Sequence, residues 1–143
     1  MSKPRILLAD DHPQMLSSLC RLADKAGEVV GAVTDGRAAV ETAHRLRPDV
    51  VVLDLMMPRV GGLDAARAIR KDLPDCRVVL CTMYANATIR YEAFAAGVVG
   101  FVRKQLAHSD LVPAIRAAVA GETFVSPSLE PHASPPQTNG GSG

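Results

Sequence analysis

The sequence predicts a doubly wound α/β domain built on a parallel sheet. Five short apolar runs rich in Val, Ile and Leu recur along the chain, each followed by a longer stretch with helical periodicity. The runs are nearly continuous rather than alternating, which is typical of strands buried on both faces. They lie at Ile6–Ala9, Val29–Val33, Val50–Leu53, Val78–Cys81 and Gly100–Val102. Because strands that alternate with helices form parallel sheets, we expect five strand–helix units in a single domain.

The helical stretches at the two ends of this pattern have recognisable boundaries. Pro13 opens the first helix and Gly27 is expected to close it. Its apolar face consists of Met15, Leu16, Leu19, Leu22 and Ala23. In the last helix, we expect Ser109 as the N-cap and Pro113 near the first turn, where a missing N–H costs least. The apolar stripe of that helix consists of Leu111, Ile115, Ala118 and Val119.

The composition changes at residue 126. Residues 126–143 hold four of the ten prolines and three of the eleven glycines, with Glu130 as the only charge. Such a segment is typical of a linker and not of a second domain. We therefore expect a folded domain over residues 1–125 and a flexible linker or tail over residues 126–143.

Composition and charge exclude several classes of protein. The chain has 143 residues, 48% hydrophobic and 22% charged, which is the composition of a globular protein. Sixteen basic residues against 15 acidic ones leave a net charge of +1, so no basic surface is expected for nucleic acid or membrane binding. No apolar stretch approaches the length of a membrane helix. Three cysteines without metal-site spacing favour a reduced, cytoplasmic location with buried thiols.

Polar side chains stand at the carboxyl ends of four predicted strands. Asp10 and Asp11 follow the first strand, Asp54 follows the third, Thr82 follows the fourth, and Lys104 comes shortly after the fifth. Ligands of open α/β sheets bind at the edge where these carboxyl ends meet. Two aspartates alone could cap a helix, and a single Asp could belong to a turn, but five polar residues at one edge indicate a site.

These residue types are suited to phosphoryl transfer. Carboxylates 4 Å apart repel by about 4 kcal/mol per pair at an effective dielectric constant near 20. Lys104 alone cannot neutralise three of them, whereas a divalent cation can, and hard oxygen ligands favour Mg²⁺. One carboxylate can then act as the nucleophile towards a phosphoryl group. The cation, the Lys104 ammonium and the Thr82 hydroxyl would bind the phosphoryl oxygens.

The chain resembles the receiver domain of two-component response regulators, over about residues 4–125. The matching pieces are Asp10-Asp11, the segment from Asp54 through Pro58 to Gly62, Thr82, and the segment Gly100-Phe-Val-Arg-Lys104. The resemblance implies a flavodoxin-like fold with five helices and a five-stranded parallel sheet of order 2-1-3-4-5. It also implies a phosphorelay signalling module and not an enzyme acting on a metabolite.

The same resemblance implies roles for individual residues. Asp54 would accept a phosphoryl group from a histidine kinase or phosphotransfer protein, with Thr82 and Lys104 assisting. The Mg²⁺ ligands would be Asp10, Asp11, Asp54 and the backbone carbonyl of Met56. Thr82 and Phe101 would form the switch pair that reports phosphorylation.

A finer resemblance is to the NarL–FixJ group of receivers. It rests on the Asp-Asp-His-Pro start, on Thr82-Met83, and on the segment Ala-Gly-Glu-Thr-Phe-Val-Ser-Pro-Ser-Leu at residues 120–129. In that group the receiver precedes a linker and a helix-turn-helix domain. Two roles therefore stay open: a stand-alone receiver acting through a homodimer or a downstream protein, and the N-terminal part of a transcription regulator cut in its linker. Residues 1–143 themselves are not expected to bind DNA.

Other chemistries are less consistent with the sequence. A haloacid-dehalogenase-type phosphatase needs a second Asp two residues after its nucleophile, where this chain has Met56. A flavodoxin needs a Ser/Thr-rich phosphate loop, which is absent. The histidines, which are His12, His44, His108 and His132, lack metal-ligand spacing, so we expect them at the surface or at helix ends. His12 could tune the charge of the acidic site next to it.

Overall fold

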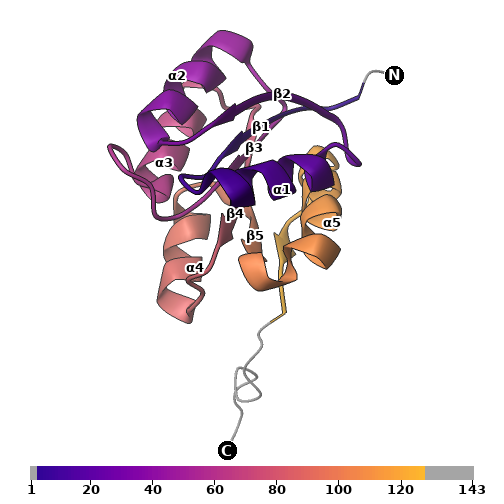
Figure 1. The fold of residues 1–143 in the computed structure, drawn as a ribbon. Helices are drawn as coiled ribbons and strands as arrows, with labels where there is room; N and C mark the ends of the chain where they lie inside the picture. Colours follow the sequence, from indigo (N-terminus) through magenta and orange to yellow (C-terminus); the bar gives the residue numbers. More distant parts are fainter. Residues whose placement is uncertain (1–2, 128–143) are drawn as a thin grey trace, which may run out of the picture.

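The computed structural model describes residues 3–127 and contains a parallel sheet with helices on both faces (Figure 1). Its strands are β1 (Arg5–Ala9), β2 (Glu28–Val33), β3 (Val50–Leu53), β4 (Arg77–Thr82), β5 (Val98–Arg103) and the two-residue β6 (Phe124–Val125). The strand order is β2-β1-β3-β4-β5-β6. The predicted fold class and the order 2-1-3-4-5 are therefore confirmed, with one additional short strand at the edge.

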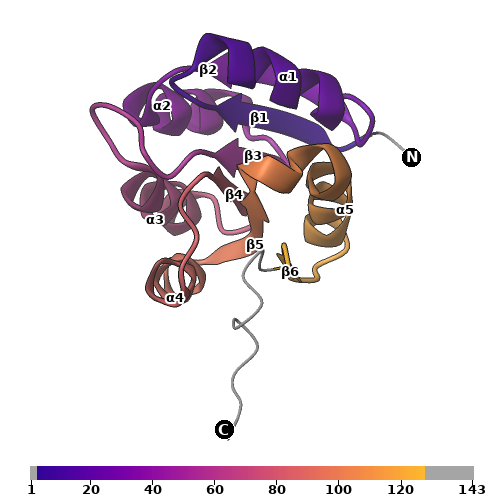
Figure 2. The ribbon, with the colours of Figure 1, turned by 60° about the horizontal axis from the view of Figure 1, so that its bottom comes forward.

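The helices form two layers around the sheet. On one face lie α1 (Pro13–Ala23) and α5 (Ala107–Val119), and on the other lie α2 (Gly36–Leu46), α3 (Gly62–Asp72) and α4 (Ala87–Ala95) (Figures 1 and 2). The central strand β3 is buried along its whole length. Val50 and Val52 face the α1/α5 layer, and Val51 and Leu53 face the other layer. This two-sided burial explains why the strand is a continuous apolar run.

The first helix ends earlier than expected. It stops at Ala23 instead of continuing to Gly27, and the chain tightens there into a turn with i→i−3 hydrogen bonds, from the Lys25 N–H to the Leu22 carbonyl and from the Ala26 N–H to the Ala23 carbonyl. Gly27 instead lets the chain pass close to β1, since a Cβ there would lie 2.3 Å from the Pro4 carbonyl oxygen. The expected apolar face is confirmed, with Leu16, Leu19 and Ala23 buried and Met15 and Leu22 packed against the core.

The start of the last helix was also predicted wrongly. A 3-10 turn, η1 (Lys104–Leu106), leads directly into α5, so the helix begins at Ala107 and Ser109 is not its N-cap. The Ser109 hydroxyl donates to the Leu106 carbonyl oxygen at 3.0 Å. Pro113 consequently lies inside the helix, beyond its first turn.

The strand β6 attaches the end of the domain to β5 (Figure 2). Val125 pairs with Phe101, whose carbonyl oxygen accepts the Ser126 N–H at 2.8 Å. The Ser126 hydroxyl accepts the Arg103 N–H at 3.1 Å and donates to Asp110 Oδ2 at 2.7 Å. Ser126 is 5% exposed, so the packed part of the chain reaches this residue. The linker or tail expected further on lies, from residue 128, outside the described residues.

The remaining features of the fold concern the cysteines and membrane association. Among residues 3–127, no helix combines the length and apolar character needed to cross a bilayer.

All three cysteines are free. Burial raises the pKa of the Cys76 thiol to about 11 and that of Cys81 to about 12, as expected for unreactive core thiols.

Replacing Ser126 by Ala should lower the free energy of unfolding by about 1–3 kcal/mol, because a buried backbone N–H and a carboxylate lose their hydrogen-bond partner. Urea denaturation of both proteins measures the difference. Ser109→Ala is the matched control: it removes an exposed serine hydroxyl on α5 and should change stability by less than about 0.5 kcal/mol. Equal stability of Ser126→Ala and the unchanged protein would show that β6 is not held by this side chain.

Candidate functional site

The structure brings the predicted polar residues to one edge of the sheet. Asp10 and Asp11 follow the end of β1, Asp54 follows β3, Thr82 ends β4, and Lys104 begins the turn after β5. The strands β1, β3, β4 and β5 are neighbours in that order. The side chains of four loops therefore converge at the carboxyl edge, as predicted.

Lys104 is buried between two carboxylates. Its Nζ lies 2.6 Å from Asp10 Oδ2 and 3.1 Å from Asp54 Oδ2, and the three side chains are 3%, 1% and 5% exposed, respectively. Burial lowers the pKa of Lys104, but the two carboxylates outweigh burial, so its pKa lies above the ordinary value. The ammonium ion is therefore the stable form of this side chain.

The charge of Asp54 is incompletely balanced. Burial raises the pKa of its carboxyl group, and the nearby Lys104 ammonium only partly opposes this effect. Asp10 and Asp11 add two more carboxylates, while Lys104 supplies a single positive charge. Binding of a further cation lowers the electrostatic free energy of these carboxylates and so stabilises the site.

Two buried carboxylate oxygens at the site accept no hydrogen bond and fit a divalent cation. Asp11 Oδ1 has only its 3.0 Å contact with His12 Nδ1, and Asp10 Oδ2 has only its ion contact with Lys104. One potential ligand atom from each of Asp10, Asp11, His12 and Asp54 lies within 4.8 Å of the others. Three of the four donors are carboxylate oxygens, which suit Mg²⁺. His12 belongs to this cluster, although its sequence spacing did not identify it as a metal ligand.

The backbone around Asp54 is closely packed. The Asp54 N–H donates to the Ala9 carbonyl oxygen at 3.0 Å, which ties the end of β3 to the end of β1. Gly62, at the start of α3, donates its N–H to the Leu55 carbonyl oxygen at 2.8 Å. A Cβ at Gly62 would lie 2.2 Å from the Asp54 carbonyl oxygen, so only glycine allows α3 to begin this close to the site.

Thr82 and Phe101 occupy neighbouring strands of the buried sheet. Thr82 is fully buried, and its Oγ1 accepts the Tyr84 N–H at 3.1 Å. Phe101 is 1% exposed and packs in the core on the side of α4. In the register of β4 and β5, Thr82 lies opposite Arg103, and Phe101 lies opposite Leu80. The proposed switching role of the pair stays a prediction.

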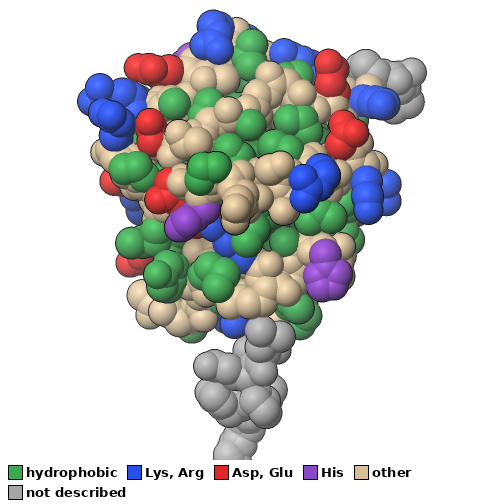
Figure 3. Space-filling model, viewed as in Figure 1, with side chains coloured by type: hydrophobic (Ala, Val, Ile, Leu, Met, Phe, Trp, Pro, Cys, Tyr) green, Lys and Arg blue, Asp and Glu red, His purple; other side chains and the backbone are tan. Residues whose placement is uncertain are grey.

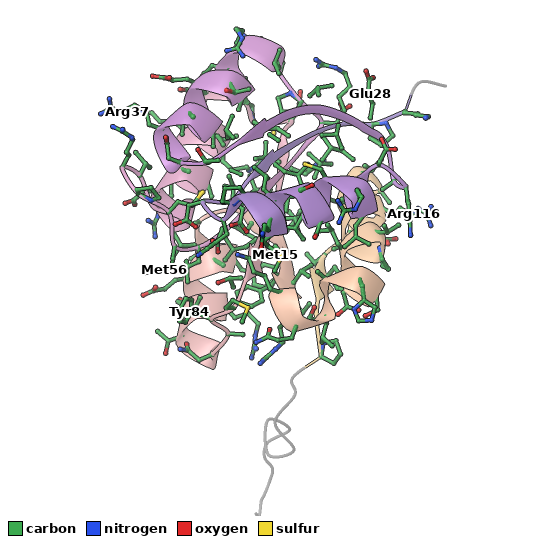
Figure 4. All side chains as sticks on the ribbon, in the orientation of Figure 1. Met15, Glu28, Arg37, Met56, Tyr84 and Arg116 are labelled. Atoms are coloured by element: carbon green, nitrogen blue, oxygen red, sulfur yellow. The ribbon has the colours of Figure 1, made fainter. Side chains whose placement is uncertain are left out.

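Apolar side chains stand exposed beside the acidic cluster. Met56 is 58% exposed and Tyr84 57%, and both lie on the same side of the molecule (Figure 4). On the face shown in Figure 3, hydrophobic side chains also gather near α4, while acidic and basic side chains are dispersed. Tyr91, on α4, is 76% exposed. Residues with these exposures can contact a bound group or a partner protein.

Comparison with known proteins gives a consistent result. The family model described as the response regulator receiver domain matches residues 6–116. Response regulator GacA of Pseudomonas aeruginosa is 35% identical over 127 residues, which cover 87% of this chain and 59% of GacA. Response regulator protein VraR of Staphylococcus aureus is 31% identical, with 87% of this chain and 61% of VraR covered. The chain thus spans about three-fifths of the length of these relatives.

Solved structures show the same similarity. A LuxR-family two-component response regulator from Aurantimonas sp. SI85-9A1 superposes with a TM-score of 0.84 at 36% identity, covering 88% of this chain and 91% of that one. The signal receiver domain of NarL from Mycobacterium tuberculosis gives 0.81 at 32% identity, covering 85% and 100%. The receiver domain of RcsB from Salmonella enterica serovar Typhimurium, determined with the phosphomimetic BeF₃⁻, gives 0.80 at 27% identity, covering 87% and 94%.

Replacing Lys104 by Met should lower the free energy of unfolding by about 3–5 kcal/mol in metal-free buffer at neutral pH, because two buried carboxylates lose their counter-charge. Adding Asp54→Asn should recover part of the loss. Denaturant unfolding of the single and double variants measures both effects, with the exposed Lys71→Met as the control. If Lys104→Met unfolds at the same denaturant concentration as Lys71→Met, the ion pairs do not stabilise the site.

Proposed function

Because the chain belongs to the response regulator receiver domain family, we propose that Asp54 is the phosphoacceptor of a two-component phosphorelay. The chain is a phosphoaccepting signalling module and not an enzyme that turns over a metabolite. The observation that carries the assignment is the position of Asp54. Of the three aspartates, Asp54 is the one that follows the central strand β3; like Asp10 it contacts Lys104 and belongs to the cluster of potential ligands.

The proposed phosphoryl donor is a phosphohistidine on a histidine kinase or phosphotransfer protein. An Asp54 carboxylate oxygen attacks phosphorus, the P–N bond to the donor imidazole breaks, and its electron pair returns to the ring. Lys104 Nζ, now 3.1 Å from Asp54 Oδ2, is positioned to bind a phosphoryl oxygen once that carboxylate has become an acyl phosphate. The Thr82 hydroxyl, at the same edge, would bind another phosphoryl oxygen.

The proposed metal is Mg²⁺, bound by Asp10, Asp11, Asp54 and the backbone carbonyl of Met56. When bound, it would offset the negative charge of the phosphoryl oxygens. The cluster of carboxylate oxygens from Asp10, Asp11 and Asp54, which a single lysine does not neutralise, supports this assignment.

The proposed output is a change on the face formed by α4, β5 and α5. Thr82, at the end of β4, would move when its hydroxyl binds the phosphoryl group. Phe101 on β5 would transmit this movement to the surface. Tyr91, whose side chain stands out from α4, is suited to anchor a homodimer or a downstream protein. We place this chemistry in the cytoplasm, where the free thiols stay reduced.

For the parent protein we propose transcription regulation, with a receiver that extends through Ser126 and is followed by a linker. Related solved structures include a LuxR-family response regulator and the response regulator RcsB, which is described by its conformational dynamism for DNA interaction. A stand-alone receiver that acts only by protein contact remains the alternative. Sequencing the reading frame beyond residue 143 distinguishes them, because a helix-turn-helix domain needs several dozen further residues.

Incubation with acetyl phosphate and Mg²⁺ should add one phosphoryl group per chain, observable by intact-protein mass spectrometry. Asp54→Ala should abolish the gain, because it removes the carboxylate proposed to accept the phosphoryl group. Asp64→Ala, which removes an exposed aspartate on α3, is the control and should be labelled like the unchanged protein. Full labelling of Asp54→Ala, or of the unchanged protein after chelation of the metal, would refute the assignment.

The phosphorylated form should lose its phosphate slowly for a receiver. Hydrolysis needs a water in line with the P–O bond, and the exposed Met56 and Tyr84 beside the site offer neither a carboxylate nor an amide to hold it. Met56→Asn and Tyr84→Glu should each speed dephosphorylation, and about 1.4 kcal/mol of barrier corresponds to a tenfold change in rate. The decay of purified phosphoprotein is the measurement. Unchanged decay in both variants and in the double variant would exclude this shielding.

A further inference from the structure

The C-terminal end of the domain is held by few contacts. Gly121, with a φ of 78°, turns the chain back after α5, and residues 124–126, which we call the C-terminal strap, then run beside β5 (Figure 2). Phe124 packs against the core, whereas Val125 is 44% exposed. A segment attached by a two-residue strand belongs to the less stable parts of a domain and can open without global unfolding.

The Ser126 hydroxyl bridges two parts of the chain. It accepts the Arg103 N–H at 3.1 Å and donates to Asp110 Oδ2 at 2.7 Å. These partners lie on either side of Lys104 in the chain, because Arg103 immediately precedes it and Asp110 follows it in the first turn of α5. Hydrogen-bond distances vary by only a few tenths of an ångström, so one hydroxyl keeps both bonds only while its partners stay equally far apart.

The groups proposed to bind the phosphoryl oxygens are both direct neighbours of Arg103. Lys104 is the next residue in the chain, and Thr82 lies opposite Arg103 in the register of β4 and β5. At present Lys104 Nζ is buried and lies 3.1 Å from Asp54 Oδ2. Movement of Lys104 or Thr82 towards a phosphoryl group on Asp54 therefore displaces the backbone to which Ser126 is bonded.

We propose that the C-terminal strap is a conformational switch, docked on β5 while Asp54 is unmodified and released when Asp54 carries a phosphoryl group. The displacement of Lys104 changes the separation of Arg103 from Asp110, so the Ser126 hydroxyl loses one of its two bonds. The few contacts that remain then no longer hold the strap. The proposal rests on the proposed function, because the phosphoryl group is the trigger. It adds an output besides the face formed by α4, β5 and α5, since release repositions the C-terminal end of the domain.

Coupling of this kind acts in both directions. If a phosphoryl group releases the strap, the docked strap opposes binding of that group by the same factor. A variant whose strap is already released should therefore bind a phosphoryl mimic more tightly. A strap that only stabilises the fold would leave this affinity unchanged, so the affinity distinguishes a switch from a structural attachment.

Amide hydrogen exchange followed by NMR, with and without Mg²⁺ and beryllofluoride, tests the release in the unchanged chain. The N–H groups of Arg103 and Ser126 should exchange at least about tenfold faster with beryllofluoride bound. The Arg77 N–H, bonded to the Asp49 carbonyl oxygen at the start of β4, is the internal control and should change by less than about twofold. Unchanged or slower exchange at either Arg103 or Ser126 would overturn the proposal.

A pair of serine variants tests the coupling. Ser126→Ala removes the bridge, and Ser109→Ala is the matched control, because the Ser109 hydroxyl contacts the other carboxylate oxygen of Asp110 at 3.0 Å. Ser126→Ala should bind beryllofluoride at least about threefold more tightly, and Ser109→Ala should bind it like the unchanged protein. Equal affinities of the two variants would contradict the switch. Circular dichroism checks that both fold, and the exchange experiment on the unchanged chain decides the matter if Ser126→Ala does not.

Failure of the proposed function has a different signature. Beryllofluoride would then leave the NMR resonances around Asp54 unshifted in the unchanged protein, and the strap would lose its trigger as well. If beryllofluoride shifts those resonances while the exchange at Arg103 and Ser126 stays the same, the proposed function stands and the switch alone is refuted.

Discussion

The buried ammonium of Lys104 is the interaction on which the carboxyl edge of the sheet depends. It joins residues that follow β1, β3 and β5, because its contacts to Asp10 and Asp54 reach across the sheet. Withdrawing three charged groups from water costs several kcal/mol per ion, and only close contacts offset that cost. The surplus of negative charge that remains is what makes the edge suited to a cation and to a phosphoryl group.

The strand β5 connects the ion pairs of Lys104 to the rest of the domain. Lys104 follows β5 directly, and β5 also carries Phe101 in the core and holds β6 along its outer edge. Ser126 is bonded to the backbone of both Phe101 and Arg103. If a phosphoryl group replaces the Asp54 carboxylate as the partner of Lys104, any shift of Lys104 would therefore be felt at the end of β5. The C-terminal segment of the domain is paired with this strand.

The sequence was sufficient for features set by periodicity, and insufficient for those set by loop geometry. Continuous apolar runs identified the strands, and parallel topology then placed Asp10, Asp54 and Lys104 at one edge. The approach of His12 to the acidic pair depends on the backbone path after β1, which no residue spacing reveals. Likewise, composition alone assigned Ser126 to the start of a linker. Its hydrogen-bond partners, Asp110 and Arg103, lie 16 and 23 residues earlier in the chain, so no local pattern indicates them.

The central claim is that Lys104 exchanges its contact with the Asp54 carboxylate for one with the phosphoryl group. A crystal structure with Mg²⁺ and beryllofluoride tests it most directly. We predict beryllium bonded to an Asp54 carboxylate oxygen, Lys104 Nζ within hydrogen-bond distance of a fluoride, and the metal bound by Asp10, Asp11 and Asp54. Beryllofluoride bound elsewhere, or an Asp54 that remains paired with Lys104 and unmodified, would contradict it.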